Sequence, residues 1–126
     1  MEIRPALPAD APDLAALEAR LWREAYEGLI PAPDLERYLA ETFGPSQQAA
    51  ELADPASRIL VLDEGHALLG YAWLRAGAPE VEVPFESPLE VARFYVDRTL
   101  HGTGAARTLM TAALAHAASA GHDGVW

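Results

Sequence analysis

The sequence predicts a mixed α/β fold, on three observations. The apolar patterns along the chain give a strand, helices, a hairpin, a strand, a long helix and a final strand. The chain has 126 residues and is 51% apolar, which suits one packed domain over residues 1–126. It contains no cysteine, so a disulfide framework, a thiolate metal site and a cysteine nucleophile are all excluded.

The first part of the chain is expected to form one strand and three helices. An apolar run predicts a strand at residues 3–7, which Pro8 ends. Leucines then recur at helical spacing after Asp10, a good N-cap residue, as far as the breaker Gly28. Two more helices are expected before Pro55, so the three predicted helices cover residues 10–27, 33–44 and 46–53.

The second part is expected to be built mainly of strands. Two apolar runs flank the turn residues 63–66 and predict a hairpin of residues 58–62 and 68–74. An irregular segment at 79–88 carries three prolines and three glutamates. A strand at 89–96, a helix at about 104–120 and a strand beginning at 123 complete the prediction.

The charge of the chain restricts the class of partner. Nine basic residues, all of them Arg, stand against nineteen acidic ones, giving a net charge of −10. A nucleic acid partner is therefore not expected, because no basic stripe is present to replace its counterions. The acidity would attract an amine or another cation, or it serves only to keep an alanine-rich protein in solution.

Targeting and metal signals are absent from the sequence. No apolar stretch approaches the length of a membrane span, and the first residues do not resemble a signal peptide, so we expect a cytoplasmic protein without a membrane partner. The histidines lie apart from further ligands at metal-binding spacing, so no metal site is expected.

The segment from residue 89 to 110 carries the clearest chemical signal. A strand is followed by Gly102 and Gly104 and then by a helix with Arg107 in its first turn. Unpaired N–H groups at a helix N-terminus bind phosphate, and glycines let a ligand approach the main chain. A tight strand–helix connection without a ligand is the alternative. A Walker loop is excluded because there is no Lys, and a dinucleotide fingerprint lacks its third glycine.

The stretch His101-Gly102-Thr103-Gly104-Ala105-Ala106 resembles the pyrophosphate loop of the GNAT (GCN5-related N-acetyltransferase) superfamily, Gln/Arg-x-x-Gly-x-Gly/Ala. The similarity extends to Arg93–Val96 before the loop, to Arg107–Met110 after it and to upstream segments that include residues 22–31 and 69–72. The resemblance implies an acyl-CoA N-acyltransferase-like fold, a mostly antiparallel twisted mixed sheet flanked by helices, and transfer of an acetyl group from acetyl-CoA as co-substrate to a primary amine.

The resemblance also implies the cofactor contacts. Main-chain groups of the fourth strand are expected to bind the pantetheine arm, and main-chain N–H groups of the glycine loop are expected to bind the pyrophosphate. The ring of His101 either contacts phosphate or has only a structural role in the loop. The expected cofactor residues are Phe94, Tyr95, Val96, His101, Gly102, Thr103, Gly104, Ala105, Ala106 and Arg107.

Glu90 is the candidate general base that deprotonates the acceptor amine. Its spacing from Gly104 matches the strand-four glutamate that serves as base in the histone acetyltransferase branch of the family. The alternative is that Glu90 is only an exposed carboxylate at a strand's edge, and that the amine loses its proton through ordered water instead. Strand alternation predicts that Glu90 shares a face with Ala92, Phe94 and Val96, and that Tyr95 lies on the opposite face.

The acceptor site is expected near the end of the first helix. By resemblance, Trp22, Tyr26 and Leu29 shape this site, and the acceptor is a small molecule or a peptide that carries the amine. At helical spacing, Trp22 and Tyr26 are alternatively core or groove-wall residues.

The family pattern normally continues with the rest of a fifth strand, a fourth helix with a cofactor-binding Asn and a Tyr acid, and a final hairpin, which no residues here match. We therefore expect a domain that stops in its fifth strand. The alternative function is an acyl-CoA-binding relic or fragment without catalysis. An open strand edge would allow it to associate with another copy through the unfinished sheet.

Overall fold

The computed structural model describes all residues from 1 to 126, and these divide into two compact units. One unit combines residues 1–6 with residues 55–126, and the other consists of residues 7–54. The expectation of one domain over residues 1–126 stays a prediction.

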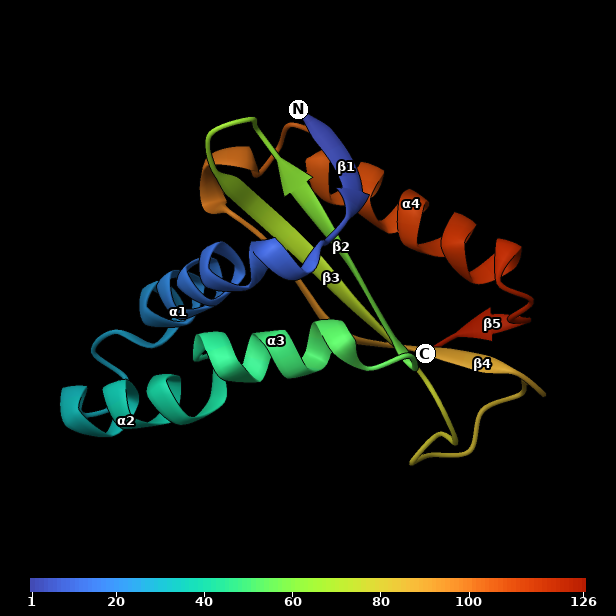
Figure 1. The fold of residues 1–126 in the computed structure, drawn as a ribbon, viewed down its shortest axis with the longest axis horizontal. Helices are drawn as coiled ribbons and strands as arrows, with labels where there is room; N and C mark the ends of the chain where they lie inside the picture. Colours follow the sequence, from blue (N-terminus) through green and yellow to red (C-terminus); the bar gives the residue numbers. More distant parts are fainter. The chain divides into compact units, whose positions relative to one another are not determined.

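The first unit is built on a five-stranded sheet with the strand order β1-β2-β3-β4-β5 (Figure 1). Neighbouring strands from β1 to β4 are antiparallel, and β5 runs parallel to β4. The predicted mixed, mostly antiparallel sheet is therefore confirmed. The strands are β1 Glu2–Pro5, β2 Ser57–Asp63, β3 Leu68–Ala76, β4 Pro88–Val96 and β5 Gly124–Val125.

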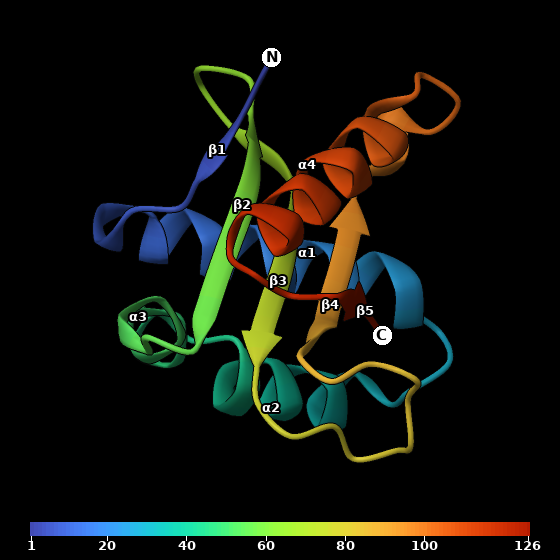
Figure 2. The ribbon, with the colours of Figure 1, turned by 90° about the vertical axis from the view of Figure 1, so that its right-hand side faces the viewer.

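One helix, α4 (Ala105–Ser119), crosses one face of this sheet (Figure 2). The helix packs with a narrow row of side chains, in which Leu109 is fully buried between Ala105 and Ala113. Small alanines bring the helix close to the strands, and each fully buried leucine contributes about 2 kcal/mol of burial free energy. The strand residues buried in this core are Leu60, Leu62, Ala72, Leu74 and Leu89.

A β-bulge interrupts the pairing of β3 with β4 at Ala92. Trp73 pairs with Arg93 whereas the next residue of β3, Leu74, pairs with Val91, so Ala92 is an extra residue on β4. A bulge of this kind shifts the alternation of side chains by one position. Odd-numbered residues of β4 therefore face α4 before the bulge, and even-numbered residues face it after the bulge.

The bulge corrects the predicted faces of β4. Leu89 and Val91 before it, and Phe94 and Val96 after it, all belong to the core on the α4 side. The other face carries three cross-strand pairs whose side chains touch: Arg75–Glu90 by hydrogen bonds, Trp73–Arg93 by a cation–π contact and Tyr71–Tyr95 by their rings.

The prediction that Glu90 shares a face with Phe94 and Val96 is therefore wrong, and so is the prediction that Tyr95 lies opposite Glu90. Both predictions rest on uninterrupted alternation between residues 90 and 96, and the extra residue at Ala92 reverses that alternation. Glu90 and Tyr95 lie on the same face.

The segment between β3 and β4 is fastened to the turn that precedes β5. Asp123 accepts the main-chain N–H groups of Glu86 and Ser87 at 2.9 and 2.8 Å. A Cβ atom placed on Gly124 would clash with the ring of Phe85, so only glycine allows this ring to pack there. The irregular segment predicted at 79–88 is thus held at its C-terminal end.

The second unit consists of α1 (Ala11–Tyr26), α2 (Ala32–Thr42) and α3 (Pro45–Ala53), as the sequence predicts. Arg23 on α1 and Glu36 on α2 form a double hydrogen bond, with both distances 2.8 Å. No helix in the structure combines the length and the apolar character needed to cross a lipid bilayer.

Candidate functional site

The loop between β4 and α4 is ordered by its own polar groups. It begins with the 3-10 turn Arg98–Leu100, where buried Asp97 accepts both the N–H and the hydroxyl of Thr99 at 2.9 and 2.7 Å. The Thr103 hydroxyl donates to the carbonyl of Leu100 and accepts the N–H of Ala105 at 3.3 Å. The loop is therefore shaped without a ligand.

Two glycines set the conformation of this loop. Gly102 and Gly104 have φ angles of 81° and 88°, in the left-handed region that favours glycine. A Cβ atom on either would meet nothing within 4 Å, so the space beside both residues is open. Gly104 is also the N-cap of α4.

The loop presents a row of main-chain donors. The N–H groups of His101, Thr103 and Ala105 are bonded within the loop. Those of four other residues have no hydrogen-bond partner in the structure, namely Gly102, Gly104, Ala106 and Arg107. Unpaired donors at the positive end of a helix dipole suit an anion such as a phosphate.

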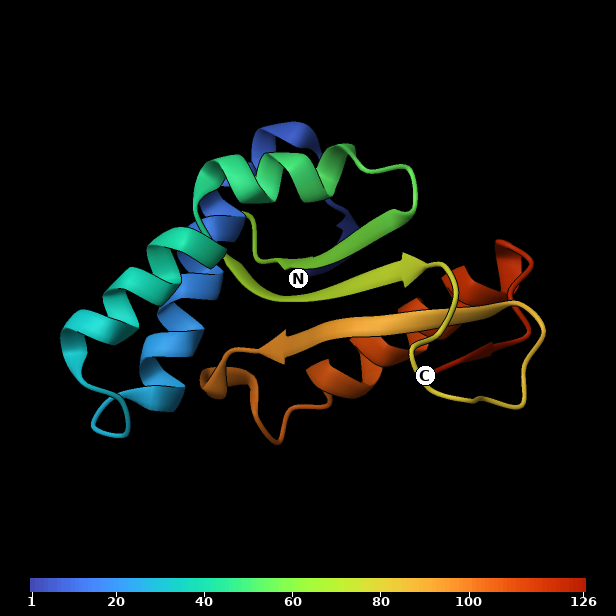
Figure 3. The same ribbon diagram turned by 90° about the horizontal axis from the view of Figure 1, so that it is seen from below.

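The edge of β4 beside this loop lacks a partner strand. β5 pairs with Pro88 and Leu89 alone, and two further bonds involve Trp126: its N–H donates to the carbonyl of Leu89 at 3.0 Å, and its carbonyl accepts the N–H of Val91 at 2.8 Å. Figure 3 shows that β5 lies beside the first part of β4 only. The second half of β4 is therefore open on this side.

Hydrogen-bond alternation shows which residues use this open edge. Asp97 donates to Leu69 of β3 at 2.8 Å, so Tyr95, two residues earlier, also bonds toward β3. The main-chain groups of Phe94 and Val96 then face the open edge. Of the three residues predicted to bind pantetheine through their main chain, Phe94 has both its N–H and its carbonyl free, and Val96 has its N–H free.

The His101 ring has a partner within the protein. Its Nε2 atom lies 3.2 Å from the carbonyl oxygen of Val96, in position to donate. Of the two roles considered for this ring, the geometry agrees with the structural one. The contact ties the glycine loop to the end of β4.

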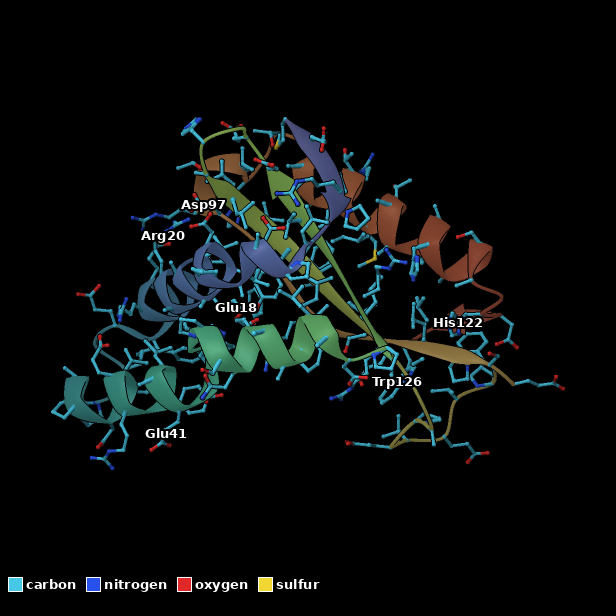
Figure 4. All side chains as sticks on the ribbon, in the orientation of Figure 1. Glu18, Arg20, Glu41, Asp97, His122 and Trp126 are labelled. Atoms are coloured by element: carbon cyan, nitrogen blue, oxygen red, sulfur yellow. The ribbon has the colours of Figure 1, made fainter.

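The candidate base Glu90 lies beside a polar pocket of about 220 Å³ on the face of the sheet away from α4. Arg75, opposite Glu90 on β3, donates from Nε and Nη2 to its Oε1 at 2.8 and 2.6 Å. The other oxygen of Glu90 has no protein partner. Trp126, labelled in Figure 4, lines the same pocket.

Two of the three predicted acceptor residues pack together in the helical unit. The rings of Trp22 and Tyr26 stack with centroids 4.9 Å apart, and both pack against a core that contains Phe43. Leu29 lies apart and is 76% exposed. The structure thus agrees with a packing role for the two aromatic residues, and the acceptor role of all three stays a prediction.

Several residues at the site had no sequence signal of their own. Arg75 and Trp73 stand in an apolar strand, and their partners on β4 depend on a register that crosses the long 77–87 connection. Asp123 was identified only as the start of a strand. No group of three or more His, Asp or Glu side chains is arranged to hold a metal ion.

Comparison with known proteins agrees with this geometry. The family model described as "Acetyltransferase (GNAT) family" matches residues 15–126. A protein of Mycobacterium tuberculosis named as an uncharacterized N-acetyltransferase is 31% identical over 117 residues, which cover 93% of this chain and 70% of the relative.

Solved structures share the fold. The PaiA N-acetyltransferase of Thermoplasma acidophilum, solved in complex with coenzyme A, has a TM-score of 0.76 at 18% identity and covers 95% of this chain and 73% of its own. AAC(6′)-Iy, solved in complex with a bisubstrate analogue, has a TM-score of 0.71 at 14% identity, covering 99% of this chain and 76% of its own. With a family match over most of its length, the chain belongs to the GNAT acetyltransferase family.

Proposed function

We propose that this protein transfers an acetyl group from acetyl-CoA to a primary amine. The observation that carries the proposal is the combination of an open β4 edge with unpaired N–H groups at the start of α4. The pyrophosphate of CoA would accept from the loop N–H groups, and the amide groups of pantetheine would bond the main chain of Phe94 and Val96. The Thermoplasma neighbour with bound coenzyme A supports this choice of co-substrate.

In the proposed reaction, the amine nitrogen attacks the thioester carbonyl of acetyl-CoA. A C–N bond forms, the C–S bond breaks, and the thiolate of CoA leaves and takes up a proton. The attacking amine must first lose its own proton, because an ammonium ion has no free electron pair. We assign this proton transfer to Glu90, acting directly or through a water molecule.

The geometry of Glu90 fits this role. One of its oxygens is held by Arg75, which fixes the position of the carboxylate. Its other oxygen, Oε2, has no protein partner and lies beside a pocket that an amine can enter. The general acid that protonates the thiolate is not assigned.

The first test measures CoA binding by calorimetry and thiol release with a panel of amines. Gly104→Glu places a bulky negative side chain in the loop, and we expect it to weaken CoA binding by at least about tenfold, since each charge-assisted bond contributes roughly 1.5–3 kcal/mol. Gly65→Glu is the matched control, because Gly65 also has a positive φ and an open surrounding but lies in the β2–β3 turn.

The outcomes separate the two functions under consideration. Binding and turnover that both depend on Gly104 support the acetyltransferase. Binding of CoA without turnover of any amine would favour the acyl-CoA-binding relic. Equal CoA affinity in Gly104→Glu and Gly65→Glu would remove the phosphate-loop assignment.

A further inference from the structure

The pocket beside Glu90 contains hydrogen-bonding groups that the protein itself does not use. It lies where β3 ends and β4 begins, on the face away from α4, and its volume is about 220 Å³. This is below the roughly 300 Å³ at which pockets for drug-sized ligands begin, so it suits one small head group. The polar and aromatic side chains that line it are those of Arg75, Glu80, Glu90 and Trp126.

Two donors in this pocket have no partner. Arg75 gives Nε and Nη2 to one oxygen of Glu90, and its Nη1 has no protein acceptor. The ring N–H of Trp126 is buried and also unpaired. A buried donor without an acceptor destabilises the protein, and a ligand oxygen would remove this cost.

The guanidinium of Arg75 is held in place for such a contact. Its central carbon lies 5.0 Å from the ring centroid of Trp73, and the Trp73 N–H is itself fixed by Ser57 at 2.9 Å. Stacking on a ring uses the flat face of a guanidinium and leaves the N–H groups in its plane available. Planar N–H groups of this kind fit a carboxylate best.

The same pocket also holds negative charge. Oε2 of Glu90 and the carboxylate of Glu80 have no partner in the structure, and both residues line the pocket. A ligand that fills the pocket therefore meets hydrogen-bond donors from Arg75 and Trp126 and carboxylates from Glu90 and Glu80. A simple amine would satisfy the carboxylates but not the buried N–H of Trp126.

We propose that the acceptor is an α-amino acid, whose carboxylate binds Arg75 and Trp126 and whose amino group lies by Glu90 and Glu80. This inference rests on the proposed function, which it narrows from any primary amine to an amine with an adjacent carboxylate. An acceptor amine next to Glu90 is also where the proposed base has to act.

The experiment compares matched acceptors by thiol release from acetyl-CoA. Each of the common amino acids is tested beside its amide and its decarboxylated amine, which keep the side chain and lose the negative charge. We expect at least one amino acid to exceed both analogues by about tenfold or more in kcat/KM, as loss of a charged hydrogen bond implies. Amides or decarboxylated amines that equal or exceed every amino acid would overturn the proposal.

Variants assign the effect to the pocket. Trp126→Phe keeps an aromatic ring and removes the N–H, and it should raise the ratio of KM for the amino acid to KM for the amide by about tenfold. Arg75→Lys keeps the charge and loses the planar donors; it also loosens Glu90 and so affects both acceptors, but it should raise the same ratio. Arg37→Gln is the control, since Arg37 is an exposed residue of α2 that has 69% of its side chain in solvent. A KM change of equal size for acid and amide would contradict the assignment.

Binding without turnover separates this inference from the proposed function. Calorimetry in the presence of CoA measures the affinity of the protein for the amino acid without any chemical step, and the affinity for the amide is the reference. Amino acid binding that requires Trp126 supports the inference even where no acetyl transfer occurs. Amine acetylation with no preference for the carboxylate leaves the proposed function standing and refutes the inference.

Discussion

Asp123 and Ser87 are joined in both directions: the Asp123 carboxylate accepts the N–H of Ser87 at 2.8 Å, and the Asp123 N–H donates to the carbonyl of Ser87 at 3.2 Å. These bonds connect the turn before β5 to the residue that precedes β4. The connection from β3, which carries Glu80 of the polar pocket, is therefore held at one end by Asp123.

The Asp123 contact makes the stability of this connection depend on pH. Hydrogen bonds from the N–H groups of Glu86 and Ser87 lower the pKa of Asp123 in the folded protein. A lowered carboxyl pKa stabilises the fold at pH values above the unfolded pKa of about 3.9, and this contribution is lost as the pH falls through the folded value. Asp123→Ala should therefore expose the amides of Glu86 and Ser87 to faster hydrogen exchange at pH 7.

The control for Asp123 is Glu82→Ala, which removes a carboxylate of the same connection that makes no hydrogen bond in the structure. Hydrogen exchange followed by mass spectrometry on peptides covering residues 77–88 should distinguish the two variants. Equal protection in both would show that Asp123 does not hold the segment.

His116 on α4 is expected to make the folded state sensitive to mild acid. Burial lowers its pKa, and the positive charges of Arg58 and His122 lower it further. Because the unfolded chain binds the proton more readily, the free energy of unfolding should fall as the pH drops below about 6.5. His116→Gln should flatten this decline.

Urea unfolding at pH 8 and at pH 5.5 measures the effect of His116. His66→Gln, in the turn between β2 and β3, is the control and should keep the decline of the parent protein. If the free energy of unfolding falls equally with pH in the parent protein, in His116→Gln and in His66→Gln, a group other than His116 causes the acid sensitivity.

Gly70 of β3 is expected to tolerate no side chain. A Cβ atom there would lie 2.7 Å from Cδ1 of Leu62 and 2.9 Å from the carbonyl oxygen of Tyr95. The second contact is with main chain and cannot be relieved by a rotamer change, so Gly70→Ala should push β4 away from β3. We expect a loss of about 1–3 kcal/mol in the free energy of unfolding, measured by urea denaturation.

A loss in Gly70→Ala that is no larger than that in Gly65→Ala would contradict this account. A Cβ atom at Gly65 would meet nothing within 4 Å, so its substitution tests only the cost of a positive φ.

Glu90→Gln tests the proposed base while keeping the fold of the pocket. Glutamine retains an oxygen that accepts from Arg75 but does not take up a proton from the amine. We expect kcat to fall by about 10²- to 10⁴-fold with KM for acetyl-CoA unchanged. Steady-state kinetics over pH 6 to 9 checks this, with Glu82→Gln as the control. A parent-like kcat in Glu90→Gln would assign deprotonation to water alone.

The elements of this fold could be predicted because their signals are local. The helix α1 lies within the predicted 10–27, and α3 within one residue of the predicted 46–53. The glycine loop was likewise visible in the sequence, since Gly102 and Gly104 stand directly before a helix with alanines in its first turn.

The faces of β4 could not be predicted, because a bulge has no reliable local signal. Residues 89–96 are compatible with an unbroken strand, and only the pairing with β3 shows that Ala92 is an extra residue. The Arg75–Glu90 pair was missed for a related reason. The register of β3 against β4 determines this pair, and the whole sheet sets that register. The connection over residues 77–87 is too long for a turn type to fix the register from the sequence.

The bulge at Ala92 also indicates which changes of length this chain can accept over evolution. Deleting Ala92 would join the Val91–Leu74 and Arg93–Trp73 pairs into one unbroken ladder and would leave every other side chain of β4 on its present face. Replacing Ala92 by another residue changes no face. Relatives that keep the activity should therefore be able to lose the extra residue at position 92, whereas a further single-residue insertion within residues 89–96 should be rare, because it would move part of the strand to the other face.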